Sequence, residues 1–211
     1  MRYTTVIFDF DGTLADSRDV GMEVMNGLAD EFGYAPIRAD EISALQAISA
    51  RELVRKRAGI PLWNIFKLRR FEGRAREELE RRSTSIQLFE GIAEMLKELR
   101  GARCELGVVT SNDEKIVYQA LGRAGTDVDF VQAGSSFFGK ARAIRNALKT
   151  YHIDRSHAVY VGDELRDIEA CKKVGIDMTA VGWGFNDAET LQGAGVRVAA
   201  TPQELFVMLA K

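Results

Sequence analysis

The sequence places two aspartates, Asp9 and Asp11, one residue apart at the end of an apolar run and follows them at once with Gly12 and Thr13. Like charges this close repel each other, and burying either one without a partner is costly. The pair therefore predicts one of two arrangements: the carboxylates stay in water, or a cation lies between them. The residues at the ends of later apolar runs favour the second arrangement.

Polar residues follow several of these later runs, each near the carboxyl end of its run. In open parallel sheets, ligands bind beyond the carboxyl ends of the strands, so these side chains are expected to share one rim with Asp9 and Asp11. The rim would thus gather acids, hydroxyls and one lysine. Its further residues are Thr110, Ser111, Asn112, Lys140, Asp163 and Asp167.

This set of side chains suits a metal-bound phosphate. Asp9, Asp163 and Asp167 supply hard oxygens of the kind that Mg²⁺ takes, and the ion would let close carboxylates coexist in their ionised form. A phosphate at the metal would be held by the Thr110 hydroxyl, by nearby backbone N–H groups and by Lys140. A carboxylate at the rim can attack phosphorus and form an aspartyl-phosphate. The second aspartate of the N-terminal pair is placed to protonate the leaving oxygen and later to activate water.

The strand-like runs that position these residues alternate with helical stretches. Six β-rich runs span residues 4–10, 104–110, 128–133, 158–163, 177–183 and 196–200. The last helix is predicted to start at Pro202, because Thr201 and Glu204 form a capping box around it. Strands that alternate with helices imply right-handed crossovers and a parallel sheet that helices cover on both faces.

One long gap interrupts this alternation, between the first strand and the second. Residues 17–84 look wholly helical, and a long helix can start at Pro61. Four apolar residues fall on one face of the first helical stretch: Val20, Val24, Leu28 and Phe32. The predicted fold is thus α/β, a Rossmann-like parallel sheet core of residues 1–16 and 85–211 with an α-helical cap of residues 17–84 inserted after the first strand. The cap could serve as a lid or as a dimerisation element.

Four ordered segments resemble the motifs of the haloacid dehalogenase-like (HAD) hydrolase superfamily, most closely its phosphoglycolate phosphatase-like branch with a helical C1-type cap. The segments read "DFDGTLADS", "GVVTSN", "FFGKARAIRNAL" and "YVGDELRDIEACKKVGI". The resemblance spans the whole chain. It implies a Mg²⁺-dependent phosphatase rather than a dehalogenase, because the dehalogenases of this superfamily lack the second aspartate, Asp11. One departure is Ala141 after Lys140, where many relatives have proline.

The resemblance also implies which carboxylates react and which hold the metal. Asp9 would be the nucleophile and a metal ligand. Asp11 would be the general acid and base, and its carbonyl would also bind the metal. Asp163 would be a further metal ligand, and Asp167 would be either a ligand or a neighbour of the ligands.

The remaining rim residues would bind the phosphoryl group. By the same resemblance, Thr110 would bind phosphate with help from Ser111 and Asn112, and Lys140 would stabilise the pentavalent state. The substrate would be a small phosphorylated metabolite: a phosphoglycolate-like ester, a sugar phosphate or a nucleotide monophosphate. Two alternatives are a phosphomutase on the same core and a non-catalytic protein that binds a phosphorylated ligand.

Composition excludes several classes of partner. The 211 residues carry a formal net charge of -2, so no global field attracts nucleic acid. No apolar run approaches the ~18 residues of a membrane span, and no signal peptide is visible. Two cysteines, Cys104 and Cys171, in a chain too long to need a disulfide favour a reducing cytoplasm. The chain is expected to act as a monomer or a homodimer.

The predicted cap carries a basic bias. Between residues 51 and 82, eleven lysines and arginines oppose five acids, an excess of +6 in a chain of net charge -2. Two interpretations are open: an exposed charged helix face, or a positive lid that draws anionic phosphate esters to the rim.

Overall fold

Short apolar runs rich in valine build one parallel sheet. The computed structural model describes residues 2–45, 50–61, 63–134 and 139–210. The strands of the sheet are β1 (Thr5–Phe8), β4 (Glu105–Val109), β5 (Phe130–Gln132), β6 (Ala158–Gly162), β7 (Asp177–Val181) and β8 (Arg197–Ala199). They lie in the order β5-β4-β1-β6-β7-β8, and every neighbouring pair is parallel. The predicted parallel sheet is confirmed, although each strand is shorter than its apolar run.

The strand order places a topological switch point at β1. From β1 the chain runs outward through β4 to β5, and it then returns to β6 on the other side of β1. Val6 of β1 is paired with Leu106 of β4 and with Val159 of β6. Ligands of open α/β sheets bind in the crevice outside such a point, at the carboxyl ends of the strands. The residues that follow β1, β4 and β6 are therefore the candidates for a site.

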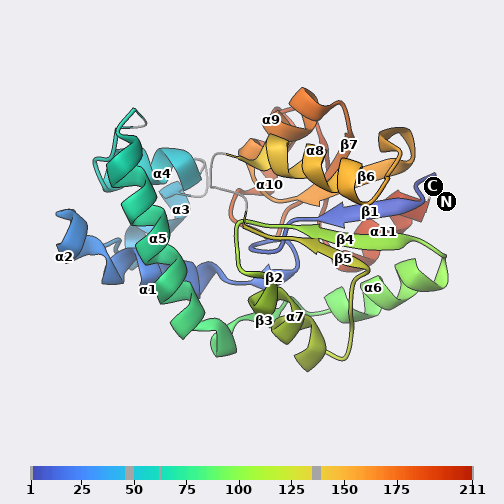
Figure 1. Cartoon of the computed structure of the whole chain (residues 1–211), viewed down its shortest axis with the longest axis horizontal. Helices are drawn as coiled ribbons and strands as arrows, with labels where there is room; N and C mark the ends of the chain where they lie inside the picture. The colour runs from blue at the N-terminus through green and yellow to red at the C-terminus, as the bar shows by residue number, and fades with distance from the viewer. Residues whose placement is uncertain (1, 46–49, 62, 135–138, 211) are drawn as a thin grey trace.

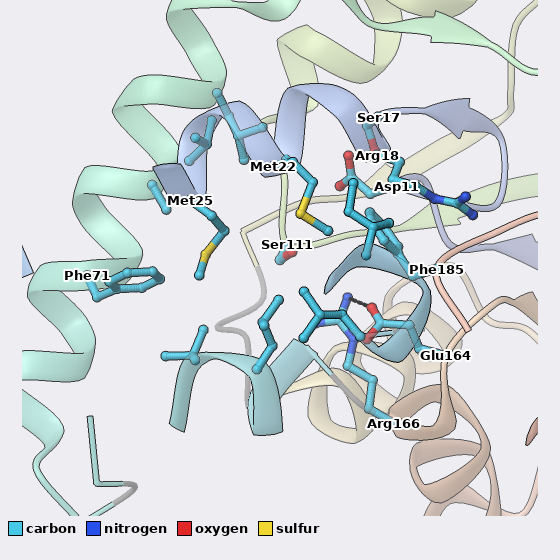
Figure 2. Close-up of a pocket in the computed structure, with 18 residues that line it drawn as sticks. Asp11, Ser17, Arg18, Met22, Met25, Phe71, Ser111, Glu164, Arg166 and Phe185 are labelled. Atoms are coloured by element: carbon cyan, nitrogen blue, oxygen red, sulfur yellow. Dashed lines mark ion pairs between the residues drawn. The ribbon is translucent and has the colours of Figure 1, made fainter. Parts of the chain in front are cut away.

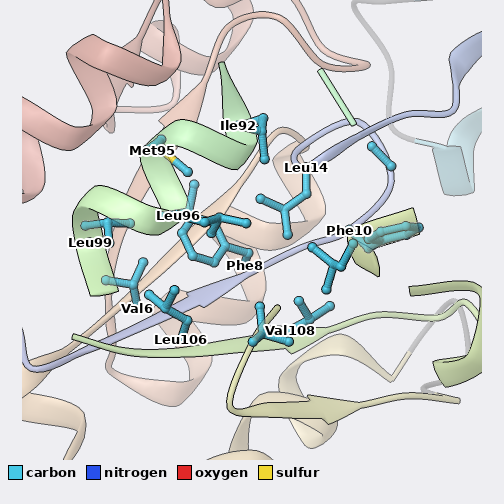
Figure 3. Close-up of a cluster of buried hydrophobic side chains, with 14 of the residues drawn as sticks. Val6, Phe8, Phe10, Leu14, Ile92, Met95, Leu96, Leu99, Leu106 and Val108 are labelled. Atoms are coloured by element: carbon cyan, nitrogen blue, oxygen red, sulfur yellow. The ribbon is translucent and has the colours of Figure 1, made fainter. Parts of the chain in front are cut away.

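Helices cover both faces of the sheet, as the alternation predicts (Figure 1). One face carries α6 (Ile92–Gly101), α7 (Glu114–Arg123) and α11 (Pro202–Ala210), and the other carries α8 (Lys140–Thr150), α9 (Leu165–Val174) and α10 (Ala188–Gly193). On the first face, Phe8, Leu96 and Leu106 are almost wholly buried in one apolar cluster (Figure 3). Glu204 accepts a hydrogen bond from the backbone N–H of Ala200 at 2.7 Å, which confirms the predicted start of the last helix.

A pair of short strands separates this core from a helical insertion. β2 (Ala15–Asp16) pairs antiparallel with β3 (Gln87–Leu88), so the chain leaves the core and returns to it side by side. The helices between them are α1 (Arg18–Gly27), α2 (Ala29–Phe32), α3 (Ile42–Leu45), α4 (Ala50–Arg57) and α5 (Ile65–Arg81). The predicted α/β fold with a helical insertion after the first strand is confirmed. The predicted cap boundaries, residues 17 and 84, fall beside this strand pair.

The insertion has an apolar core of its own. The four residues predicted to share one face are all buried: Val24, Leu28 and Phe32 belong to this core, and Val20 packs with the main core. Phe32 packs edge-on against Phe71, with ring centroids 5.0 Å apart. The long helix begins after Asn64 rather than at Pro61. The reason is that the Asn64 side chain caps it, accepting a hydrogen bond from the backbone N–H of Lys67 at 3.0 Å. Across the described part of the chain, no helix combines the length and apolar character needed to cross a bilayer.

Several basic side chains of the insertion pair with acids of the insertion itself. The pairs join Glu31 to Arg70 and Arg74, and Glu78 to Arg81 and Arg82. Such pairs at a solvated surface contribute little to stability, and their charges cancel at short range. They favour the interpretation of the basic bias as an exposed charged face over that of a positive lid.

Candidate active site

The carboxyl ends of β1, β4 and β6 bring the predicted rim residues together. Asp9 follows β1, Thr110 follows β4 and Asp163 follows β6, and Lys140 opens helix α8. Asp9 is 1% exposed, Lys140 5%, and Thr110 and Asp163 are 0% exposed. The backbone N–H of Asp9 donates to the carbonyl of Val161 at 2.8 Å, which continues the β1–β6 ladder into the site.

Three carboxylates form a buried cluster at this rim. One oxygen each of Asp9, Asp163 and Asp167 lies within 4.8 Å of the others. Asp163 is held in place from two sides: the Thr13 hydroxyl donates to its Oδ1 at 2.8 Å, and the Phe185 backbone N–H donates to its Oδ2 at 2.7 Å. Burial, together with the nearby charges of other carboxylates, raises the pKa of Asp163 well above its ordinary value.

Lys140 is a buried cation in direct contact with this cluster. Its Nζ donates to Asp9 Oδ2 at 2.6 Å and to the Tyr160 hydroxyl at 3.0 Å, and it lies 3.3 Å from Asp167 Oδ1. Burial alone would lower the pKa of Lys140, but the charges of Asp167 and Asp9 outweigh it and raise the pKa. The lysine therefore remains a cation, as a phosphate-binding role requires.

A second, largely buried cation, Arg166, lies at the rim and was not predicted. Its guanidinium pairs with Glu164 Oε1 at 2.6 Å (Figure 2). It also comes within 3.9 Å of Asp9 Oδ2. Its side chain is 15% exposed. Burial opposes its charge, but the surrounding carboxylates raise the pKa of Arg166. Its position in the sequence could have indicated this role, because Arg166 lies between the predicted rim residues Asp163 and Asp167. Helix α9 begins in this segment, and its first turn directs the Arg166 side chain back toward the rim.

The charges of the rim fit a divalent cation. Carboxylates outnumber cations there, and burial raises the pKa of Asp167 to about 6 even though Lys140 acts to lower it. A hard cation would compensate this excess and would bind carboxylate oxygens directly. The donor chemistry and the closeness of the three oxygens therefore fit Mg²⁺. The groups that meet at the rim are the carboxylates of Asp9, Asp11, Asp163, Glu164 and Asp167 and the cations of Lys140 and Arg166.

Asp11 lies on the other side of Asp9, toward the insertion. Asn112 donates through Nδ2 to both oxygens of Asp11, at 3.3 and 3.4 Å. Withdrawal from water and the charge of Asp9 together raise the pKa of Asp11 to about 6. A carboxyl group with a pKa near neutrality can donate and accept a proton during turnover. The backbone N–H of Asn112 also donates to the Thr110 hydroxyl at 2.9 Å, which ties the segment after β4 to the rim.

Gly12 allows the first loop to approach Asp163. Its φ of +75° lies in the left-handed region, and a Cβ there would come within 2.2 Å of Asp163 Oδ2 and 2.6 Å of the Phe185 ring. No side chain fits that space without displacing a carboxylate of the cluster. The glycine after Asp11 therefore serves both the turn and the packing of the site.

A cavity of about 190 Å³ opens between this rim and the insertion. Asp11, Ser111 and Arg166 line its core side, as Figure 2 shows. This cavity therefore offers a ligand space beside the carboxylates that the insertion encloses in part. All eight predicted site residues lie at the rim or in the segments that form it.

Comparisons with known proteins agree with this geometry. A family model described as haloacid dehalogenase-like hydrolase matches residues 6–181 of the chain. The phosphoglycolate phosphatase of Synechococcus elongatus is 38% identical over 203 residues, which cover 95% of this chain and 91% of that protein. The tyrosine-protein kinase PtkA of Mycobacterium tuberculosis is 30% identical over 216 residues, which cover 95% of this chain and 70% of that protein.

The fold is also found among solved structures. The crystal structure of a predicted phosphatase from Clostridium acetobutylicum matches with a TM-score of 0.83 and 20% sequence identity, covering 99% of this chain and 98% of that one. At this level of identity the likeness shows the fold alone. The sheet, its helices and the insertion after the first strand are thus a shared architecture.

Proposed function

The chain belongs to the haloacid dehalogenase-like hydrolase family, and on that premise we propose that it is a Mg²⁺-dependent phosphatase that hydrolyses a small phosphate monoester through an aspartyl-phosphate. Its similarity to a phosphoglycolate phosphatase supports a phosphoglycolate-like ester as substrate, and a sugar phosphate and a nucleotide monophosphate are the alternatives. The observation that carries the proposal is the buried carboxylate cluster beside Lys140, with Asp11 facing the cavity.

The proposed reaction has two steps. In the first, a carboxylate oxygen of Asp9 attacks phosphorus, the bond from phosphorus to the ester oxygen breaks, and Asp11 gives its proton to the leaving alcohol. In the second, water attacks the phosphorus of the aspartyl-phosphate and gives a proton to Asp11. Phosphate leaves, and the Asp9 carboxylate and the Asp11 acid are regenerated.

The other rim residues would hold the phosphoryl group. Lys140 and the Thr110 hydroxyl, helped by Ser111 and Asn112, are proposed to bind its oxygens as charge develops on them. Mg²⁺, when bound, would neutralise charge on the carboxylates and on the phosphoryl group. Its proposed ligands are the side chains of Asp9, Asp163 and Asp167 and the backbone carbonyl of Asp11.

The core and the insertion are proposed to have different roles. Residues 1–16 and 85–211 are proposed as the catalytic core, and residues 17–84 as a cap that closes over the rim and opens again for release. We propose that the protein works in the cytoplasm, because a chain of 211 residues that uses only two cysteines is typical of a reducing compartment. It would act on a small phosphorylated metabolite as a monomer or a homodimer.

Phosphate release tests the proposal directly. With para-nitrophenyl phosphate or a panel of natural monoesters, we expect stoichiometric release of phosphate with Mg²⁺ and none after chelation with EDTA. A phosphomutase would give an isomerised ester and little free phosphate. Binding of the esters without turnover would point to a non-catalytic protein, and activity that survives EDTA would contradict the metal requirement.

Arg166 is expected to assist at the same phosphoryl group, because its guanidinium lies within 3.9 Å of Asp9 Oδ2. An Arg166→Gln variant is expected to lose roughly 10- to 100-fold in kcat and to bind the inhibitor vanadate more weakly. Arg166→Lys should restore part of both. Arg142→Gln, at an exposed position of α8, is the matched control. Unchanged vanadate affinity in Arg166→Gln would limit the arginine to holding Glu164.

A further inference from the structure

The cavity between the rim and the insertion has two chemically different sides. Its core side presents the polar groups of Asp11, Ser111, Glu164 and Arg166. Opposite them, helices α1, α4 and α5 present almost only carbon and sulfur (Figure 2). The side chains there include Met22, Met25, Val54, Phe71, Ala75 and Leu79.

A bound monoester would extend across this cavity in a fixed direction. Its phosphorus must reach Asp9, and its leaving oxygen must face Asp11, whose carboxyl group lines the cavity. The rest of the leaving group then lies on the insertion side, against the methionines and Phe71. The polarity of the insertion side of the cavity therefore affects which leaving groups the site accepts.

The cations that border this cavity are already paired. Arg18 donates to the backbone carbonyls of Trp183 and Gly184, and its guanidinium lies away from Met22 and Met25 in Figure 2. On the core side, the guanidinium of Arg166 pairs with Glu164. Among the described residues, the insertion contributes no cation to this cavity besides Arg18.

One other cation lies in an adjoining space. A second cavity of about 120 Å³ shares Asp11, Phe71 and Ser111 with the first, and Arg76 of α5 lines it. The Arg76 guanidinium donates to the Ser111 carbonyl at 3.5 Å. Glu72, one turn earlier on α5, lines the same space and opposes this charge. A carboxylate on the leaving group would have to bind here.

The apolar lining of the larger cavity favours an apolar leaving group. A carboxylate or a ring of hydroxyls would lose its water there and gain few hydrogen-bond partners, because Ser17 and Arg18 are the only polar side chains that the described part of the insertion presents to this cavity. That loss is costly. Carbon would instead gain from leaving water, and the flexible methionines can adapt to its shape. An apolar cavity of about 150 Å³ is enough to take benzene, so about 190 Å³ suits a six-membered ring.

We propose that the substrates are monoesters whose leaving group carries an apolar aliphatic or aromatic body about the size of a six-membered ring. This inference rests on the proposed function, a phosphatase of small monoesters, and assigns it an apolar leaving group in place of the polar ones that the similarity suggests. It ranks such esters above phosphoglycolate and above polyhydroxylated sugar phosphates. Met22 and Met25 are the residues that set this preference.

Two esters of the same ring test the preference. Cyclohexyl phosphate and myo-inositol 1-phosphate share a six-carbon ring and differ in the hydroxyls. With Mg²⁺, kcat/KM is expected to be at least about tenfold higher for cyclohexyl phosphate than for the inositol ester or for phosphoglycolate. A higher kcat/KM for phosphoglycolate that is lost in an Arg76→Gln variant would overturn the inference and assign the leaving group to the second cavity.

Variants of the cavity wall separate binding from folding. Met22→Gln and Met25→Gln keep the length of the side chain and add an amide, so each is expected to lower kcat/KM for cyclohexyl phosphate about fivefold and to leave the inositol ester within about twofold. Val207→Gln, at an exposed position of α11, is the control. Equal losses for both esters would mean that the methionines only support the fold.

Measurements of phosphonate binding test the apolar preference independently of whether the protein is a phosphatase. If no ester were hydrolysed, the proposed function would fail, and two non-hydrolysable phosphonates would still decide the preference by calorimetry in the presence of Mg²⁺. Tighter binding of cyclohexylmethylphosphonate than of 3-phosphonopropionate would support the apolar cavity. The reverse order would overturn it whether or not the protein is a phosphatase.

Discussion

Replacing Asp9 by asparagine is expected to lower kcat by at least about 1,000-fold while the fold is retained, because the variant keeps the shape of the side chain and loses the nucleophilic oxygen. Asp9 Oδ2 lies 2.6 Å from the Lys140 ammonium group, at the edge of the carboxylate cluster. A neutral amide there cannot form the aspartyl-phosphate. It also removes one of the three negative charges that fit a metal.

The measurement has two parts. Phosphate release at saturating ester gives kcat, and acid quenching followed by mass spectrometry shows whether the peptide with residue 9 carries phosphate. We expect the phosphopeptide in the wild type and not in Asp9→Asn. Asp30→Asn, at an exposed position of α2, is the matched control. A folded Asp9→Asn protein as fast as the wild type would mean that water attacks the ester directly.

The rim could be predicted from sequence because parallel strands impose a common direction. Once Asp9, Thr110 and Asp163 are each placed at the carboxyl end of a parallel strand, their closeness follows from topology and needs no knowledge of side-chain packing. Lys140 followed in the same way from its place after the strand-like run of residues 128–133. The structure brings these residues together as predicted.

The contact between Arg166 and Glu164 could not be predicted from the positions of the strands. Both residues lie within the predicted fourth motif, but a motif assigns roles only to positions that recur in it. Their pairing depends on how helix α9 starts after β6, with the Asp167 carboxyl accepting from the backbone N–H of Glu164 at 3.2 Å. The first turn of α9 directs the Arg166 guanidinium toward Asp9. The direction of a side chain at the start of a helix cannot be predicted from a sequence motif alone.

The insertion was harder to predict, for a related reason. Its helices follow no parallel sheet, so their mutual packing depends on side-chain shape. The late start of α5 shows this: Pro61 is a plausible first residue, yet Asn64 is the better cap because its side chain reaches the N–H of Lys67. The sequence also predicts a capping box formed by Ser49 and Glu52, and Ser49 lies outside the described residues. The cavity wall of Met22 and Met25 follows from this packing and could not be predicted from spacing alone.

Replacing Lys140 by methionine is expected to inactivate the protein and also to destabilise it. Methionine is similar in length but carries no charge, so the buried carboxylates of Asp9 and Asp167 lose a cation at 2.6 and 3.3 Å. Removing one partner of a buried ion pair leaves the other uncompensated, and the free energy of unfolding is expected to fall by about 3–5 kcal/mol. A loss of at least about 100-fold in kcat should accompany it, since the phosphoryl charge loses its nearest ammonium group.

The pH dependence of this loss has a definite sign. In the metal-free wild type the pKa of Asp167 is raised to about 6, and Lys140 is among the groups that lower it. Without the lysine, the folded-state pKa rises further above the value of about 3.9 that an unfolded aspartate has. A carboxyl group whose pKa is higher in the folded state than in the unfolded state lowers the free energy of unfolding as pH rises between those two pKa values. The stability deficit of Lys140→Met should therefore grow as pH rises from about 5 to about 8.

Urea unfolding in EDTA, at several pH values, measures this deficit against a lysine that has no such role. Lys149 lies in the last turn of the same helix α8 and is exposed, so Lys149→Met should change the free energy of unfolding little at any pH. Addition of Mg²⁺ should recover part of the loss in Lys140→Met, because either cation compensates the same carboxylates. A deficit that shrank toward high pH would contradict this argument, since uncompensated carboxylates repel most when they are fully ionised.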